Sequence, residues 1–228
     1  MASRWLLGAL GASTLAFALV AWGYRDGGAV VRLDRRVASW VAADMPGWGE
    51  WAARVFSWLG GWIGLTVLAA LLTGELLRRA ARAQALLVLA VLLGAQVLTF
   101  AFKHALGRPR PTDGSAVSLP GTYSFPSGHA TTAAAFFGLL TLLLAGSLPA
   151  GRARLAGAVL GVAVVLAIGA SRVVLNVHYV SDVAGGFALG AAWLAACLLA
   201  AGALRRRRQS VPAAAEPARP GREGVTDP

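Results

Sequence analysis

Charged residues are scarce in this sequence of 228 residues, because only 14% are Asp, Glu, Lys or Arg. An average soluble domain has about 25%. Hydrophobic residues make up 57% of the chain, so the composition argues against a soluble domain and favours an integral membrane protein. The sequence has a single cysteine, Cys197, which excludes an internal disulfide and a cysteine-based zinc site.

Long hydrophobic stretches recur along the chain. Crossing a hydrocarbon core of about 30 Å takes roughly 20 helical residues. Stretches of that kind, separated by short polar connections, lie at about residues 5–23, 56–77, 83–102, 129–148, 155–173 and 183–204. The sequence therefore predicts an all-α fold, a bundle of six transmembrane helices formed by residues 1–208.

The two ends of the chain need separate interpretation. Ala16-Phe17-Ala18 matches a signal-peptide cleavage pattern, but the hydrophobic stretch continues to about Gly23. This is longer than a usual signal core, so we expect the first span to be retained. After Arg205–Arg208 the chain is rich in Pro, Ala and charge and has no apolar face, and we expect residues 209–228 to be a disordered cytoplasmic tail.

Residues 25–55 form the first long connection between spans. Apolar residues recur there at helical spacing, and three arginines lie elsewhere on the same helix; the apolar residues are Val30, Leu33, Val37, Trp40 and Val41. This pattern predicts an amphipathic helix on the membrane surface, ended by Met45-Pro46-Gly47. A purely structural role and a role as a lid over a lipid entry both remain open.

The excess of 21 Lys and Arg over 10 Asp and Glu would suggest nucleic acid binding in a soluble protein. Here the cations gather at span ends, so we expect no nucleic acid partner. The connections after the second, fourth and sixth spans contain Arg78, Arg79, Arg82, Arg152, Arg154 and Arg205–Arg208. The positive-inside rule places these in the cytoplasm with the N-terminus. Residues 103–128 and 172–182 then share the extracytoplasmic face.

The first of three polar fragments at that face contains Lys103 and Arg110. Arg110 lies between Pro109 and Pro111, which fix the backbone and aim the side chain. Arginine has a planar fork matched to phosphate oxygens, and lysine is a compact point charge. Snorkelling at a span end would explain Lys103 alone but not the rigid segment around Arg110.

The second fragment, Pro126-Ser127-Gly128-His129, opens the fourth span. Helix N-termini bind anions readily. Ser127 could cap the helix or donate to a phosphate oxygen, and Gly128 lets the backbone come close to a ligand. His129 could protonate a leaving oxygen.

The third fragment contains Ser171-Arg172, followed by His178 and Asp182. Four residues separate the last two, which puts both on one face if the segment is helical. A carboxylate beside an imidazole fixes its tautomer and raises its basicity, as a nucleophilic histidine requires. A structural His–Asp pair is the competing interpretation.

A metal site is the other alternative, with ligands drawn from His104, His129, His178 and Asp182. The three nearby cations would repel a metal ion, and two-metal phosphatases use several carboxylates. We therefore expect no metal and no cofactor.

In order and spacing these fragments resemble the signature of the type 2 phosphatidic acid phosphatase superfamily. That signature is Lys, six residues, Arg-Pro; then Pro-Ser-Gly-His; then Ser-Arg, five residues, His, three residues, Asp. Every fixed position is matched between residues 103 and 182, and the six-span layout is similar to the integral membrane branch of the family.

The resemblance implies a role for each residue. His178 would attack phosphorus and form a phosphohistidine, oriented by Asp182, and His129 would protonate the leaving oxygen and later activate water. The residues that would bind the phosphate oxygens are Lys103, Arg110, Ser127, Gly128 and Arg172.

The function implied is a metal-independent lipid phosphatase in the cytoplasmic membrane, with its active site on the extracytoplasmic face. Its substrate would be undecaprenyl pyrophosphate, phosphatidylglycerol phosphate or phosphatidic acid, and the loop at 112–124 would tune the choice. Alternatives are a phospholipid-phosphate binder or flippase without turnover, and a phosphatase or phosphotransferase for a soluble phosphate ester. The preferred lipid and the oligomeric state remain open.

Overall fold

The computed structural model describes residues 2–111 and 122–210, and all regular structure in these ranges is helical. The helices are α1 (Ala2–Arg25), α2 (Ala29–Asp44), α3 (Gly47–Leu59), α4 (Trp62–Arg78), α5 (Arg82–Leu106), α6 (Gly128–Ser147), α7 (Arg152–Val174) and α8 (Val180–Ser210). The predicted all-α class is confirmed.

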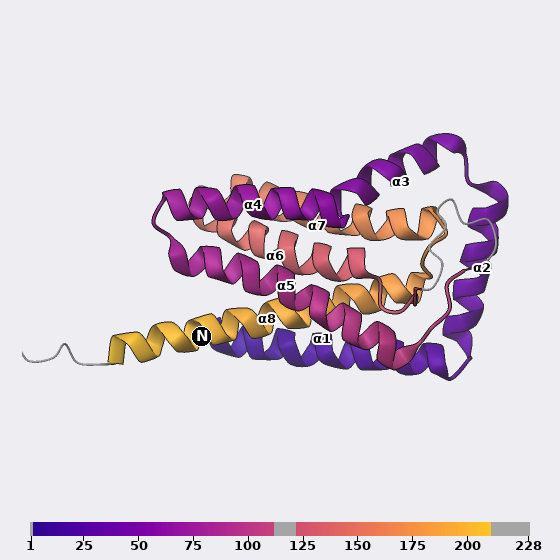
Figure 1. Ribbon diagram of the computed structural model, residues 1–228, viewed down its shortest axis with the longest axis horizontal. Coiled ribbons are helices and arrows are strands. Elements are labelled where there is room, and N and C mark those ends of the chain that lie inside the picture. Colours follow the sequence, from indigo (N-terminus) through magenta and orange to yellow (C-terminus); the bar gives the residue numbers. More distant parts are fainter. Residues whose placement is uncertain (1, 112–121, 211–228) are drawn as a thin grey trace, which may run out of the picture.

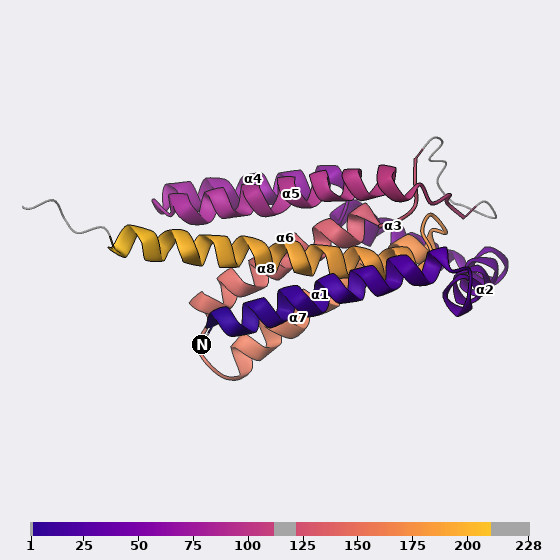
Figure 2. The same cartoon turned by 90° about the horizontal axis from the view of Figure 1, so that it is seen from below.

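The long helices lie side by side, and α2 crosses one end of the bundle (Figure 1). The view turned by 90° shows α2 at the same end (Figure 2). Helix α6 packs against α5, α7 and α8. Its buried side chains, such as Phe136 and Leu139, form the main core with residues of α4, α5, α7 and α8.

Within the described ranges, five helices are long and apolar enough to cross a membrane: α1, α5, α6, α7 and α8. Helices α3 and α4 together form a sixth candidate span, bent by 44°. The sequence predicted a continuous stretch at 56–77, but the helix breaks between Leu59 and Trp62. A Cβ atom on Gly60 would lie 2.3 Å from the side chain of Ile168 on α7. The absence of a side chain on Gly60 therefore lets the chain pack closely on α7 at the bend.

The helix predicted within residues 25–55 is α2, and Met45 ends it as its C-cap. Its inward face contains Val41 together with the carboxylate Asp34, and both residues are buried. Leu33 and Trp40, expected on the same apolar face as Val41, are exposed. Helix α2 therefore packs on the bundle through a mixed face, and its place on a membrane surface stays a prediction.

The predicted C-terminal boundary at residue 208 falls within α8, which continues to Ser210. The rest of the predicted tail, from residue 211, lies outside the described residues, as does most of the 112–124 loop. Retention of the first span also stays a prediction.

A close contact between α6 and α8 brings the second and third fragments together. A Cβ atom on Gly186 would lie 2.7 Å from the Ser127 carbonyl oxygen, and one on Gly190 would lie 2.3 Å from that of Thr131. Small residues at this spacing allow membrane helices to approach each other closely. The Ser127 amide also donates to the Asp182 carbonyl at 3.0 Å. This hydrogen bond holds the N-terminal ends of α6 and α8 next to each other.

Candidate active site

The three fragments meet at the end of the bundle that α2 crosses. Lys103 lies in the last turn of α5, His129 in the first turn of α6, Arg172 in the last turn of α7, and Asp182 in the first turn of α8. His178 lies in the turn that joins α7 to α8. Electrostatic interactions connect Lys103 to Arg110 and Arg172, and connect His129 to Arg172, His178 and Arg110. The structure thus brings the predicted charged residues and both histidines together.

His178 is buried, and its two ring nitrogens have different partners. Its Nε2 atom lies 3.2 Å from a guanidinium nitrogen of Arg110. Its Nδ1 atom lies 3.3 Å from Ser124 Oγ and 3.4 Å from Asp182 Oδ2. An arginine N–H can only donate, so Nε2 is the acceptor and the proton lies on Nδ1. This tautomer presents a lone pair at Nε2, as a nucleophile would need.

Ser124 joins His178 to Asp182, and the sequence analysis did not single it out. Its hydroxyl donates to Asp182 Oδ2, which leaves Ser124 Oγ free to accept from His178 Nδ1. The Ser124 amide donates to the Arg108 carbonyl at 2.7 Å, which fixes its position. The sequence contains further serines nearby, Ser115 and Ser118, and nothing in their spacing distinguishes one from another.

Arg108 is a second residue that the sequence analysis missed. It donates to Asp182 Oδ1 at 2.6 Å and to Asp34 Oδ2 at 2.7 Å, and both carboxylates are buried. The Ser181 amide donates to the other Asp34 oxygen at 3.0 Å. Arg108 therefore has two carboxylate partners. The sequence feature that could have identified Arg108 is the repeat Arg108-Pro109-Arg110-Pro111. Only Arg110 in this repeat matches the family pattern.

The other three cations have no carboxylate in salt-bridge contact among the described residues. Lys103 donates to the carbonyl oxygens of Tyr123 and Ser124, and Arg110 donates to that of Val177. Arg172 is buried and donates to the Ser57 hydroxyl, and within the described ranges its Nε atom has no partner. Uncompensated cations at the end of membrane helices suit a bound anion with several charges.

Burial lowers the pKa of His178 to about 4, although Asp182 acts in the opposite direction. The charges of Lys103 and Arg110 lower this pKa further. The imidazole is therefore neutral at pH 7. A neutral ring is the form that could attack phosphorus.

Ser127 is buried and caps α6, because its Oγ atom accepts from the Ala130 amide at 3.5 Å. This is the structural role that the sequence allowed for it. Donation by Ser127 to a phosphate oxygen stays a prediction, as does a close approach of ligand to Gly128.

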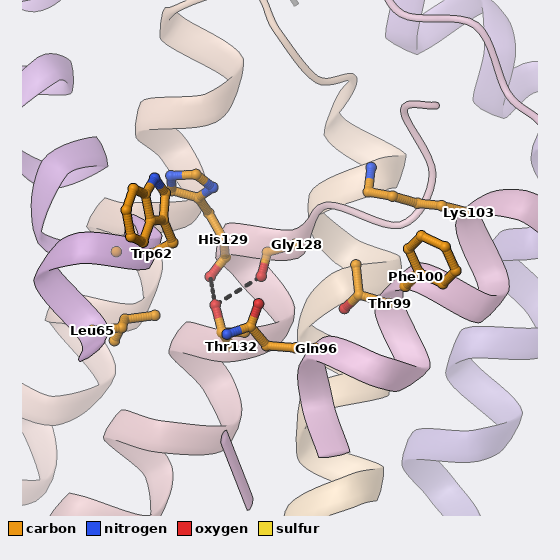
Figure 3. Close-up of a pocket in the computed structure, with 10 residues that line it drawn as sticks. Trp62, Leu65, Gln96, Thr99, Phe100, Lys103, Gly128, His129 and Thr132 are labelled. Carbon is orange, nitrogen blue, oxygen red and sulfur yellow. Dashed lines mark hydrogen bonds between the residues drawn. The ribbon is translucent and has the colours of Figure 1, made fainter. Parts of the chain in front are cut away.

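His129 lines a cavity of about 270 Å³ between α4, α5 and α6. Figure 3 shows its ring beside Trp62, with Lys103 on the opposite wall of the cavity. The His129 Nε2 atom would lie 3.6 Å from a Cβ atom on Gly61, so a side chain there would contact the ring. The bend between α3 and α4 therefore positions one wall of the site.

The described residues contain no group of three or more His, Cys, Asp or Glu side chains that could hold a metal ion. His104, a ligand in the metal alternative, is exposed, and its Nδ1 atom interacts with the Phe100 carbonyl of its own helix at 2.8 Å. Independence from metals stays a prediction.

A model of the PAP2 superfamily matches residues 84–206, which include all three fragments. The chain belongs to the PAP2 superfamily. The resemblance to type 2 phosphatidic acid phosphatases is thereby confirmed, and the apolar helices make this PAP2 protein a multi-pass membrane protein.

Two curated proteins resemble this PAP2 chain. Phosphatidylglycerophosphatase B of Bacillus subtilis is 37% identical over 106 residues, which cover 46% of this chain and 52% of the relative. Lipid A 1-phosphatase of Rhizobium johnstonii is 38% identical over 68 residues, which cover 30% of this chain and 24% of the relative. The chain thus spans about half, or less, of the length of the curated relatives it matches.

A solved structure shares the fold. It is the crystal structure of a transmembrane PAP2 type phosphatidylglycerolphosphate phosphatase from Bacillus subtilis, with a TM-score of 0.75 and 24% sequence identity. The similarity covers 87% of this chain and 96% of that one. The helical bundle therefore shares the fold of that membrane protein.

Proposed function

We propose that this PAP2 protein is a metal-independent lipid phosphatase that hydrolyses a lipid phosphate or pyrophosphate through a phosphohistidine on His178. The observation that carries the proposal is the arrangement of three cations without carboxylate partners, within the described residues, around two histidines from different parts of the chain. The names of the two curated relatives support lipid phosphates as the substrate class.

The first chemical step transfers the phosphoryl group to the enzyme. The Nε2 lone pair of His178 attacks phosphorus, and the bond to the leaving oxygen breaks. His129 takes up a proton when the anionic substrate binds, and it gives that proton to the leaving oxygen. Ser124 and Asp182 hold the Nδ1 proton of His178 and stabilise the positive charge that develops on the ring.

The second step releases inorganic phosphate. His129, now neutral, takes a proton from water as the water oxygen attacks phosphorus, and the bond from phosphorus to His178 Nε2 breaks. Both histidines then return to their starting states. Lys103, Arg110 and Arg172 stabilise the charge on the equatorial oxygens in both steps, and removing one should slow turnover on the order of 10²-fold or more.

We also infer that the site faces the extracytoplasmic side of the cytoplasmic membrane. The connection between α4 and α5 and the start of α7 lie at the end of the bundle opposite to α2 (Figure 1). These segments contain Arg78, Arg79, Arg152 and Arg154. The positive-inside rule assigns that end to the cytoplasm. A lipid head group can then reach the site by diffusing within the outer leaflet.

The test is phosphate release by the purified protein in detergent. The panel contains phosphatidic acid, phosphatidylglycerol phosphate, undecaprenyl pyrophosphate and a soluble phosphate ester. We expect release from at least one lipid and little from the soluble ester; the reverse order would favour the soluble-substrate alternative. The His178→Ala variant separates an enzyme from a binder or flippase. A binder would keep its lipid affinity and its function, whereas the enzyme would lose turnover.

A further inference from the structure

A second cavity, of about 570 Å³, lies between α2, the segment 109–111 and the turn that joins α7 to α8. Helix α2 crosses this end of the bundle (Figure 1) and contributes Arg35 and Arg36 to the cavity wall. Of the lining residues, the proposed mechanism uses Arg110 alone. Within the described ranges, this cavity shares no lining residue with the cavity of about 270 Å³ that contains His129.

The charge around the second cavity is positive. Arg35, Arg36 and Arg110 line it, and none of its described lining residues is Asp or Glu. Arg35 and Arg36 are exposed, and neither forms a salt bridge in the part of the chain that the structure describes. Their neighbour Asp34 does not compensate them, because its oxygens accept hydrogen bonds from Arg108 and from the start of α8. Three guanidinium groups around one cavity favour a bound anion, and their planar forks suit phosphate oxygens.

Contacts connect this cavity to the proposed nucleophile. Arg110 Nη1 lies 3.2 Å from His178 Nε2, so this arginine borders both the cavity and the reacting nitrogen. Tyr179, the next residue after His178, lines the cavity and interacts electrostatically with Arg35. The Tyr179 amide donates to Asp182 Oδ2 at 2.8 Å. One wall of the cavity is therefore built from the same turn as the nucleophile.

The side of the site on which the cavity lies indicates which anion reaches it. Phosphoryl transfer is in line, so nucleophile and leaving group lie on opposite sides of phosphorus. In the proposed mechanism the lipid alcohol leaves toward His129, and the second phosphate of a pyrophosphate would leave with it. The cavity borders Arg110 and Tyr179, on the side of His178. After hydrolysis, the anion that remains on that side is inorganic phosphate.

We propose that Arg35 and Arg36, together with Arg110, form a second anion site that binds the inorganic phosphate released from His178. This inference rests on the proposed function and adds a path for its second product. The cations that stabilise the phosphoryl group also retain phosphate after hydrolysis. Further cations next to them offset that attraction and guide the product out through a route separate from the lipid.

The kinetic test adds inorganic phosphate during lipid hydrolysis and measures kcat and kcat/KM at each concentration. Phosphate that rebinds in the active site competes with the lipid, so it lowers kcat/KM and leaves kcat unchanged. Phosphate in a second site also binds while lipid occupies the active site, so we expect wild-type kcat to fall as well. In the double variant Arg35→Gln with Arg36→Gln, the phosphate concentration that halves kcat should rise about tenfold or more, because charge-assisted hydrogen bonds are lost.

The matched control is Arg25→Gln with Arg32→Gln, which removes two charges from exposed positions outside the cavity. It should respond to phosphate like the wild type. Equal changes in the two double variants, or a wild-type kcat that phosphate does not lower, would overturn the second site. A variant of Arg35 and Arg36 with a raised KM for the lipid and an unchanged response to phosphate would also overturn it, because these arginines would then bind the lipid head group.

Titration calorimetry with inorganic phosphate, without lipid, gives a readout that does not depend on turnover. We expect two phosphate ions per chain in the wild type and one in the double variant of Arg35 and Arg36. A single ion in both proteins would contradict the second site. The proposed function fails differently, because the wild-type protein would then release phosphate from no lipid, whereas the titration would still count the bound ions.

Discussion

Arg108 and Asp182, separated by 74 positions in the sequence, are joined by a buried hydrogen bond of 2.6 Å. The same guanidinium binds Asp34 on α2, so the helix that crosses the end of the bundle is connected to the carboxylate beside His178. Helix α2 therefore contributes to the structure of the site. It supplies a buried charge that fixes the position of Arg108 and, through it, of Asp182.

Replacing Arg108 with alanine should destabilise the protein by about 3–5 kcal/mol, because it leaves two buried carboxylates without their shared partner. Thermal unfolding in detergent measures the change. Arg32→Ala, at an exposed position of α2, is the matched control and should change stability by less than about 0.5 kcal/mol. Adding Asp34→Asn to Arg108→Ala should recover part of the loss, since one unpaired charge is removed. An Arg108→Ala protein as stable as the wild type would contradict this account of the pair.

Ser124→Ala should lower kcat roughly tenfold with a smaller change in KM, because His178 Nδ1 loses one of its two partners and the ring is held less firmly. Steady-state kinetics on the preferred lipid gives both constants. Ser181→Ala is the control, since the Ser181 hydroxyl hydrogen-bonds with Arg108 and Asp34 and, among the described residues, not with the imidazole. It should reduce kcat much less. Equal losses in the two variants would assign Ser124 a merely structural role.

The pH dependence should reflect the depressed pKa of His178. The neutral imidazole attacks, so the rate falls as the pH drops through about 4, where the ring gains a proton. The reacting complex also needs one proton on His129, and the substrate has its own second ionisation near pH 6. A substrate monoanion brings that proton, so kcat/KM must be calculated for the substrate monoanion. On that basis we expect kcat/KM to stay flat from about pH 7 to 5. A fall centred near 6.5, the ordinary pKa of histidine, would show that the ring is not buried as described.

Excess EDTA should leave phosphate release unchanged, because three cations take the electrostatic role that metal ions have in other phosphatases. Vanadate should inhibit, since it adopts the five-coordinate geometry of phosphorus in the transition state. Initial rates with each reagent provide the measurement. Loss of activity in EDTA that a divalent cation restores would favour the metal alternative.

The bundle and the predicted cluster of site residues followed from local sequence signals. Hydrophobic length identified the spans, and fixed spacing identified Lys103, Arg110, His129, Arg172, His178 and Asp182. The close packing at Gly60 could not be predicted, because its contact with the side chain of Ile168, 108 positions away, appears only in three dimensions. A glycine pair inside a hydrophobic stretch is also compatible with a continuous helix.

Asp34 and Ser124 illustrate the same limit within the site. In the sequence, Asp34 does not differ from the other acidic residues of the amphipathic segment. The structure shows that it is buried against Arg108. No sequence pattern distinguishes Ser124 from the other serines of its loop. Both act through contacts between distant segments, which a pattern along the sequence does not encode.

The most direct test of the phosphoryl-transfer account is to trap the covalent intermediate. The protein is mixed with a radiolabelled lipid phosphate, quenched in alkali within the first turnovers, digested and mapped by mass spectrometry. The account predicts an acid-labile, alkali-stable phosphoryl group on His178, absent from His178→Ala. A phosphoryl group on any other residue, or rapid turnover by His178→Ala, would contradict it.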